Sequence, residues 1–480
     1  MIFTRLSDHS NGKAAHRAGC AVVRFSLWVA TLLVVLPALP GCAHYTVNRS
    51  IERVETILPT QRAYPQRNDD ILLVLAFSGG GTRAAALSYG VLEALGQVKL
   101  PYPPTASDSP STPYRHTLLD EVDVISSVSG GSFTAACYAL NGDRMFDDFK
   151  DSFLYRNVNG GLILSVLSPI NLVRLASRGF GRSDLAAEYY DKILFHGATF
   201  GDLYTKNTPN VFIQATDIDD GIYFGFTPYY FSPMCSDLRT YPISRAVAAS
   251  AAFPGPFSSI TLKNYAGSCD YQPPSWMAEA IEQRDTTRRD FYAASHLFTY
   301  LDPKKKAYVH LVDGGVADNL ALRGPLEVIL ARGGLMGTLE DFGLTRTRRV
   351  IFIIVNAEKQ TKTPWGLESV GPGILAILGV ASSTMITSYN YETVDLLRRS
   401  IEEWSEQNTR GDAPPIDFYA VEVGFNSLRD EKEREYFSSI STSLSLPKKE
   451  VDRLIEVAGR ILYESKEFQR LVSDLGGNIP

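Results

Sequence analysis

Runs of apolar residues separated by short glycine-rich turns dominate the first part of the chain. Residues Ile71 to Phe77 form a continuous apolar run of the kind that parallel sheets bury on both faces. A glycine triplet at 79–81 follows it, and the pattern from Thr82 to about Leu95 is helical. A second apolar run, Val122 to Val128, leads through glycines into another helical pattern. The order strand, glycine turn, helix is therefore predicted twice.

Further apolar runs at 210–219, 306–315 and 348–357 predict additional strands. Strands that alternate with helices indicate an α/β fold, here a three-layer α/β/α sandwich with a mostly parallel central sheet. We expect this first domain to span residues 70–357. Residues 358–480 mix strand and helix patterns, and we expect a C-terminal α+β extension that packs on the first domain.

The segment 365–404 joins an apolar patch to a long amphipathic helical pattern. Its most apolar part, Ile374 to Val380, is too short to span a bilayer. Periodicity does not separate a core helix from a lipid-facing lid here, so both interpretations stay open.

The N-terminus has the layout of a secretory signal. An apolar run of 12 residues, 25–36, follows four basic residues and precedes small residues: Arg5, Lys13, Arg17 and Arg24. A membrane-spanning helix is the alternative, but the run is shorter than the ~18 residues that a span needs, and Pro37 and Pro40 follow it. We therefore expect residues 1–41 to be a signal peptide.

The end of this signal resembles the cleavage box of bacterial lipoproteins, in which the cysteine becomes the lipidated first residue. The box here is Leu39-Pro40-Gly41-Cys42, which predicts lipidation of Cys42, with plain secretion as the alternative. Polar residues 42–69 then form a tether. Ala43 after the cysteine implies the bacterial cell envelope with an outer-membrane anchor, and a periplasmic or secreted protein is the alternative location.

Composition narrows the choice of partners. The chain has 480 residues, 45% of them apolar, and 47 basic against 53 acidic residues give a net charge of −6. We find no basic stripe, so no nucleic acid is expected, and no His/Cys cluster with ligand spacing, so no metal and no cofactor are expected. Cys137 is expected to be a core thiol, whereas Cys235 and Cys269 form a candidate disulfide.

The glycine triplet is ambiguous by itself. Gly79, Gly81 and Ala84 satisfy the loose spacing of a dinucleotide-binding loop. The same loop at a helix N-terminus offers free N–H groups that bind an oxyanion. A nucleotide site also requires an acidic residue about 20 positions further on, where this chain has a Pro/Ser-rich loop.

The turn after Val128 resembles the nucleophile elbow G-x-S-x-G, with Ser129 as the serine. Ser127 replaces the first glycine, while Gly130 and Gly131 follow. The alternative is that small residues only let a strand and a helix pack closely. Competing hydroxyl groups are those of Ser126, Ser127 and Ser132.

A third motif places Asp313 at the end of an apolar strand, directly before Gly314 and Gly315. Its structural alternative is a carboxylate that caps its own turn. The histidines are at 9, 16, 44, 116, 196, 296 and 310, so none follows Asp313 as an α/β-hydrolase triad requires. A Ser–Asp pair remains possible, with a triad that recruits His196, His296 or His310 as a variant.

The three motifs, in this order, resemble the patatin-like phospholipase family, of a bacterial lipoprotein type. The run at 243–262 is similar to the segment that this family has between its serine and its aspartate. The resemblance covers about residues 70–357. It implies Ser129 as nucleophile and Asp313 as its partner, with an oxyanion loop formed by Gly79, Gly80, Gly81 and Arg83, and with Gly130 as a further donor.

The resemblance implies a serine acyl hydrolase that cleaves carboxylic esters of lipids or phospholipids through an acyl-enzyme. Its expected partners are a lipid ester and a membrane surface. The aromatic run 221–233 either lines an acyl pocket or forms a core strand and hairpin. The alternative functions are a catalytically silent lipid-binding outer-membrane lipoprotein and a nucleotide-binding enzyme.

Overall fold

The computed structural model describes residues 48–54, 68–101, 116–205, 208–331, 334–359, 365, 369, 373–408 and 415–480. The predicted signal peptide 1–41, Cys42, most of the tether and the Pro/Ser-rich loop at 102–115 lie outside the described residues. The side chains of residues 374–379 also lie outside them, so the choice between core helix and lid stays a prediction.

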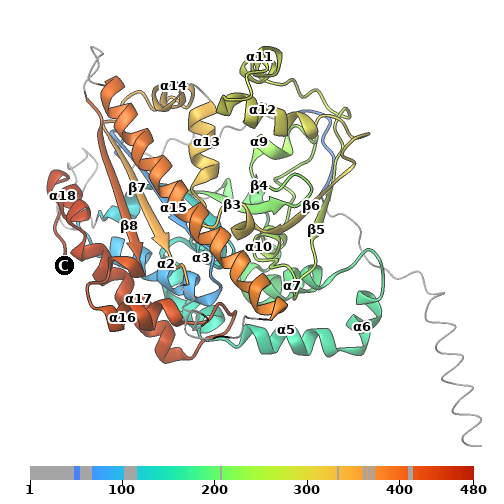
Figure 1. Cartoon of the computed structure of the whole chain (residues 1–480), viewed down its shortest axis with the longest axis horizontal. Coiled ribbons are helices and arrows are strands. Elements are labelled where there is room, and N and C mark those ends of the chain that lie inside the picture. The colour runs from blue at the N-terminus through green and yellow to red at the C-terminus, as the bar shows by residue number, and fades with distance from the viewer. Residues whose placement is uncertain are drawn as a thin grey trace, which may run out of the picture.

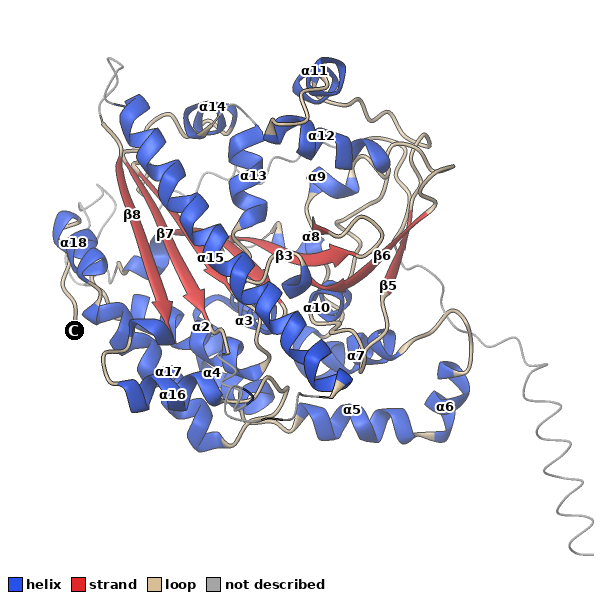
Figure 2. Ribbon diagram, in the orientation of Figure 1, coloured by secondary structure: helices blue, strands red, loops and turns tan. Residues whose placement is uncertain are grey.

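An eight-stranded sheet forms the middle of the molecule (Figures 1 and 2). Seven strands follow the order β5-β6-β3-β2-β1-β7-β8, and β4 pairs with β3. Their bounds are β1 Ile71–Phe77, β2 Val122–Val128, β3 Asn210–Asp217, β4 Ile222–Gly225, β5 Ile260–Lys263, β6 Tyr308–Asp313, β7 Arg349–Asn356 and β8 Asp417–Gly424.

The sheet is mixed, with a parallel part and an antiparallel part. Strands β3, β2, β1, β7 and β8 run parallel to one another. Strands β4 and β6 pair antiparallel with β3, and β5 pairs antiparallel with β6. The α/β sandwich expected from the sequence is confirmed, and the antiparallel strands lie at the β5 end of the sheet.

Helices cover both faces of the sheet, as a strand buried on both faces requires. Leu73, Leu75 and Phe77 of β1 face a core that includes α2 (Thr82–Leu95), α3 (Gly130–Asn141), α10 (Ile243–Ser250) and α17 (Lys448–Glu464). Val74 and Ala76 face a second core with α13 (Arg323–Ala331), α14 (Leu335–Asp341) and α15 (Ile374–Asn408). Alternate side chains of one strand therefore pack into two different layers.

Smaller helices complete the chain. Their bounds are α4 Met145–Phe149, α5 Val158–Leu167, α6 Pro169–Leu175, α7 Arg182–Tyr190, α8 Phe200–Leu203, α9 Pro228–Phe231, α11 Ser275–Gln283, α12 Arg289–Thr299, α16 Glu431–Ser439 and α18 Lys466–Asp474.

The C-terminal segment belongs to the sheet itself. Strand β8 pairs along its whole length with β7, from Arg349 opposite Asp417 to Asn356 opposite Gly424. Helix α17 lies against α2, and a Cβ built on Gly90 of α2 would lie 2.5 Å from the carbonyl oxygen of Ile455. The segment after residue 415 therefore supports the helix that follows the glycine triplet.

Residues 48–54 are bound along the β5 edge of the molecule. The side chain of Asn48 donates to the carbonyl of Lys263 (2.7 Å) and accepts from its N–H (2.9 Å). The N–H of Ile51 donates to the carbonyl of Cys235, and a disulfide joins Cys235 to Cys269. Residues 48–54 therefore lie beside this disulfide.

Among the described residues, no single helix has the length and the apolar character needed to cross a membrane. Helices α5 and α6 reach these limits only when taken as a pair, and they meet at an angle of 81°. The described residues also contain no group of three or more metal-ligating side chains.

Candidate active site

Ser129 sits at a strained turn between β2 and α3. Its φ is 50° and its ψ is −119°, a backbone conformation that residues other than glycine rarely adopt. Strand β2 ends at Val128, and α3 begins at Gly130. The serine side chain is thereby held at the carboxyl end of a central parallel strand, which is the geometry of a nucleophile elbow.

The two glycines after Ser129 are required by close backbone approach. A Cβ on Gly130 would lie 2.1 Å from the carbonyl oxygen of Gly81, and one on Gly131 would lie 2.7 Å from that of Phe77. Both distances are far below van der Waals contact, so any side chain would push the two turns apart. These glycines let the elbow and the glycine triplet lie directly against each other.

The side chain of Asp313 is hydrogen-bonded to that of Ser129. The hydroxyl of Ser129 donates to Oδ2 of Asp313 at 2.8 Å. Oδ1 of Asp313 accepts the N–H of Gly315, also at 2.8 Å. The carboxylate therefore caps its own turn and binds the serine at the same time, so the structural role and the chemical role do not compete.

Burial changes the acidity of this carboxyl group. Asp313 is 6% exposed, and this burial raises its pKa from 3.8 to about 6, although the hydrogen bonds from Gly315 and Ser129 act to lower it. A carboxylate with this pKa is a useful proton acceptor near neutral pH, unlike an exposed aspartate.

The N–H of Ser129 is held by Ser250, a residue that the sequence did not single out by itself. It donates to Oγ of Ser250 at 2.8 Å, and Ser250 in turn donates to the carbonyl of Gln214 at 2.6 Å. Oγ of Ser132 also lies 2.9 Å from Oγ of Ser250. Ser250 ends α10, within the run 243–262, and that run was its only signal.

The backbone N–H groups around Ser129 divide into two sets. Three have acceptors: Gly79 donates to the carbonyl of Asn319, Gly131 to that of Ser78, and Ser129 to Ser250. Within the part of the chain that the structure describes, those of Gly80, Gly81 and Gly130 have no acceptor. A Cβ on Gly130 would lie 2.6 Å from the nitrogen of Gly81, so two of these groups are neighbours.

Arg83 points back under the glycine triplet and is buried. Its Nε donates to the carbonyl of Ala357 at 2.8 Å, and its Nη1 donates to that of Ile440. Burial lowers the pKa of Arg83 to about 10, while the charge of Glu358 acts to raise it. The guanidinium group therefore links the loop after β7 to the C-terminal segment.

The C-terminal segment also contacts the triplet directly, a contact that no motif in the sequence predicts. The carbonyl of Ser443 accepts the N–H of Thr82 at 2.8 Å. A Cβ on Gly81, whose φ is 62°, would lie 2.5 Å from the same carbonyl. Residues more than 350 positions later in the chain thus form the back of the loop.

The histidines proposed for a triad have other positions. Nδ1 of His310 lies 3.0 Å from the hydroxyl of Thr261 on β5. The ring of His296 packs against that of Tyr292 on α12, and His196 ends a helical turn with φ of 50°. Among the described residues, no histidine forms a hydrogen bond with Ser129 or Asp313.

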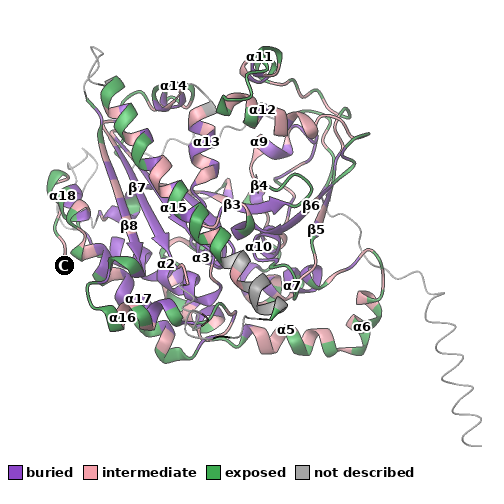
Figure 3. Ribbon diagram, in the orientation of Figure 1, coloured by how far each residue is buried: buried purple, intermediate pink, exposed green. Residues whose placement is uncertain are grey.

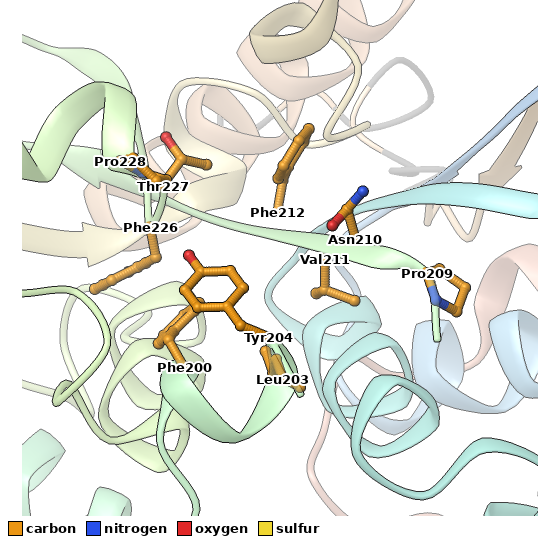
Figure 4. Close-up of a pocket in the computed structure, with 10 residues that line it drawn as sticks. All are labelled: Phe200, Leu203, Tyr204, Pro209, Asn210, Val211, Phe212, Phe226, Thr227 and Pro228. Carbon is orange, nitrogen blue, oxygen red and sulfur yellow. The ribbon is translucent and has the colours of Figure 1, made fainter. Parts of the chain in front are cut away.

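The aromatic run 221–233 is largely core. Phe224, Phe226 and Phe231 are buried, and ring centroids of Phe224 and Tyr230 lie 4.9 Å apart. A pocket beside Phe226 is lined by residues near the start of β3 (Figure 4). Ser129 instead follows β2 at its far end, where Val128 pairs with Gln214 of β3. Neither Ser129 nor Asp313 lines this pocket.

Comparisons with solved structures find distant likenesses. Human GIVD cytosolic phospholipase A2 is 13% identical with a TM-score of 0.42, and the match covers 91% of this chain and 69% of that one. Its complex with methyl gamma-linolenyl fluorophosphonate is 13% identical with a TM-score of 0.41, covering 85% and 59%. These likenesses are too distant to carry an argument about chemistry.

Sequence comparison is decisive for the family. No curated protein matches the chain. The family described as patatin-like phospholipase matches residues 75–326, which is more than half of the 480 residues and includes the glycine triplet, Ser129 and Asp313. The chain therefore belongs to the patatin-like phospholipase family, a family of lipid acyl hydrolases.

Proposed function

We propose that Ser129 and Asp313 form a catalytic dyad that hydrolyses carboxylic esters of lipids through an acyl-enzyme. The observation that carries the proposal is the hydrogen bond of 2.8 Å from the hydroxyl of Ser129 to the buried carboxylate of Asp313. The raised pKa of Asp313, about 6, supports the role of general base.

In the first step, Asp313 takes the proton of the Ser129 hydroxyl as Oγ attacks the ester carbonyl carbon. The protonated carboxyl group then gives this proton to the leaving alcohol oxygen, and the acyl group stays on Oγ. In the second step, Asp313 takes a proton from water as the hydroxide attacks the acyl carbon. The acid leaves, and Ser129 recovers its proton.

We assign the oxyanion of both steps to the N–H groups of Gly80, Gly81 and Gly130, which have no acceptor among the described residues. Gly79 donates to Asn319 and is therefore occupied. The buried contacts of Arg83 with Ala357 and Ile440 support a role in holding the loop rather than in contacting substrate. Gly79 and Arg83 thus position the donors.

The test is labelling of the full chain with a fluorophosphonate probe, located by peptide mass spectrometry. We expect one adduct, on Ser129, which Ser129→Ala abolishes and Asp313→Asn weakens strongly. Ser127→Ala is the matched serine control. Asp318→Asn is the matched acid control, because Asp318 is also buried and has a pKa of about 6, but it accepts the N–H of Arg323.

Absence of any adduct in a folded wild type, with detergent present, would remove the dyad. A protein that still bound fatty acid under these conditions would then be the lipid-binding lipoprotein of the alternative interpretation. Loss of labelling in Asp318→Asn as severe as in Asp313→Asn would show that burial alone, and not contact with Ser129, explains the effect.

We also propose that the enzyme is held at a bacterial cell envelope through lipidated Cys42. Two observations support this location: the disulfide between Cys235 and Cys269, and the binding of residues 48–54 along the β5 edge. Disulfides persist in oxidising compartments outside the cytosol. Mass spectrometry of the N-terminal peptide from the native host tests the proposal, and an unmodified Cys42 would contradict it.

A further inference from the structure

Helices α5 and α6 consist mainly of exposed and intermediate residues (Figure 3). Many of the exposed ones are large aliphatic residues. Leu164 is 72% exposed and Ile170 is 73% exposed. The whole set, which we call the α5–α6 patch, is Ile163, Leu164, Leu167, Ile170, Leu172 and Val173. Six large exposed aliphatic side chains gathered on two successive helices mark an interaction site.

The geometry of the two helices fits binding at the surface of a membrane rather than crossing it. The two helices together have the length and hydropathy of a membrane span, but they meet at 81°. Pro169 starts α6 directly after Ser168, which produces this bend. A bent apolar pair of this kind can lie in the plane of a bilayer surface with its aliphatic side chains among the acyl chains.

Charge selects the kind of surface. Between Asp151 and Asp184 the chain has no acidic residue and four arginines, at 156, 174, 178 and 182, in a protein of net charge −6. Arg174 pairs with Glu188, whereas the other three arginines are exposed. Apolar side chains flanked by exposed arginines are the composition that binds anionic lipid surfaces.

The segment that contains α5 and α6 is hydrogen-bonded at its two ends to different parts of the candidate active site. Asn159 lies in the first turn of α5, and its side chain donates to Oγ of Ser443 at 2.8 Å. The carbonyl of Ser443 accepts the N–H of Thr82, which follows the glycine triplet. The first end therefore lies on the oxyanion-loop side.

The other end is tied to the side of Asp313. Arg182 donates to the carbonyl of Gly255 at 2.8 Å, and Ser183 donates through its N–H to Oγ of Ser258 at 3.2 Å. The same segment contains Ala252, whose carbonyl accepts the N–H of Asp313. Figure 2 shows α5 and α6 along one edge of the molecule, on the side toward which the arrowheads of β7 and β8 point.

We propose that the α5–α6 patch is the surface by which this protein docks on an anionic phospholipid bilayer, so that a lipid passes from the bilayer to Ser129. The proposal rests on the proposed function for the identity of the ligand. It places Ser129 on the side of the molecule that faces the bilayer. The reason is that the segment containing α5 and α6 is bound at one end to the support of the glycine loop and at the other end to the segment that binds Asp313.

A site-specific fluorescent label tests the docking surface directly. The full chain carries Cys20→Ser and Cys42→Ser, and Leu167→Cys receives an environment-sensitive dye; the remaining free cysteine in the described residues, Cys137, is buried. Vesicles contain equal parts of phosphatidylglycerol and phosphatidylcholine. We expect the emission at position 167 to shift to the blue when vesicles are added and to be quenched by brominated acyl chains.

The matched control is the same dye at Met336→Cys, an exposed apolar position on α14. We expect no shift there. A dye at position 167 that stays in water while the protein sediments with vesicles would overturn the proposal, and so would a failure of the protein to bind vesicles at all. A shift without vesicles that disappears on dilution would assign the patch to a second copy of the chain instead.

A second measurement separates this proposal from the proposed function. The triple variant Leu164→Ser, Leu167→Ser, Ile170→Ser should lose affinity for these vesicles by roughly a thousandfold, because each aliphatic side chain buried in lipid is worth about a tenfold factor or more. Hydrolysis of a short soluble ester should be unchanged, while hydrolysis of vesicle lipid should fall with binding.

The control for the triple variant removes three exposed apolar side chains elsewhere: Ile218→Ser, Tyr308→Ser and Met336→Ser. It should bind vesicles like the wild type, and equal losses in both triple variants would contradict the docking surface. If the wild type binds vesicles through position 167 but hydrolyses no ester, the proposed function fails and the docking surface stands.

Discussion

The raised pKa of the Asp313 carboxyl group connects the chemistry of the site with the stability of the fold. Burial disfavours the charged carboxylate that the proposed mechanism needs as its base. On the proposed mechanism, the same buried position therefore sets the pH at which the enzyme works, and it lowers the free energy of unfolding at that pH.

The pH dependence of the reaction should follow this carboxyl group. Only the ionised form of Asp313 can accept the proton of Ser129, so kcat/KM on a soluble ester should rise as pH increases through about 6 and level off above it. A pH–rate profile measured from acid to neutral pH checks this expectation. A flat profile across that range would show that another group is the base.

The stability should change in the opposite direction. The folded-state pKa of about 6 lies above the ordinary 3.8, so the folded protein binds more protons between these pH values and its stability falls as pH rises through the window. Above pH 6, the buried carboxylate lowers the free energy of unfolding by an amount on the order of 3 kcal/mol. Asp313→Asn should therefore unfold at higher urea concentration than wild type at neutral pH, and the difference should shrink toward pH 4. A destabilised Asp313→Asn at neutral pH would contradict this.

Two glycines lie at the crossing of α2 and α17, but only one of them is required by close approach. A Cβ on Gly90 of α2 would lie 2.5 Å from the carbonyl oxygen of Ile455, whereas one on Gly459 of α17 would lie 3.6 Å from Cβ of Ala94. The first distance requires the helices to separate, and the second is ordinary contact.

Gly90→Ala should therefore destabilise the fold by about 1–3 kcal/mol, as overpacking of a core does. Gly459→Ala is the matched control, and it should be neutral or raise stability by up to ~1 kcal/mol because alanine favours a helix more than glycine does. Urea unfolding of both variants measures the difference. Equal effects would mean that the helix crossing tolerates separation.

Local patterns predicted the central elements closely. The runs Ile71–Phe77 and Val122–Val128 and the helix Thr82–Leu95 were expected and are β1, β2 and α2. Each is bounded by glycines or by a change of period, which are signals contained in a few neighbouring residues. The direction of β6 was not predictable, because an apolar run reads the same in a parallel and an antiparallel strand.

Contacts between residues far apart in the chain were not predictable from the sequence. Ser250 holds the N–H of Ser129 from 121 positions away, and Ile440 accepts from Arg83 across 357 positions. Nothing in a local pattern marks such a pair, since each residue is ordinary within its own helix or loop. The sequence motifs therefore pointed to Ser129 and Asp313, which the structure brings within hydrogen-bond distance, but not to the groups that hold them.

The disulfide lies where residues 48–54 bind to the rest of the fold. It joins Cys235 to Cys269, which are 34 positions apart, and the N–H of Ile51 binds the carbonyl of Cys235. A cross-link of this kind typically contributes about 2–4 kcal/mol, mainly by restricting the unfolded chain.

Replacement of both cysteines by alanine should lower the free energy of unfolding by this amount while leaving hydrolysis of a soluble ester intact. A reductant should lower the melting temperature of the wild type and leave that of the double variant unchanged, which separates loss of the bond from loss of the cysteine side chains. A wild type whose melting temperature ignores reductant would show that the bond does not stabilise this fold.

The support of the glycine loop by Ile440 and Ser443 has a consequence for the newly made chain. Ser129 and Asp313 both precede this supporting segment in the sequence. A chain in which Ile440 and Ser443 have not yet packed against the loop therefore has its serine beside a loop without this support. On the proposed mechanism, packing of the later segment completes the oxyanion donors, so hydrolysis has to wait for that folding step.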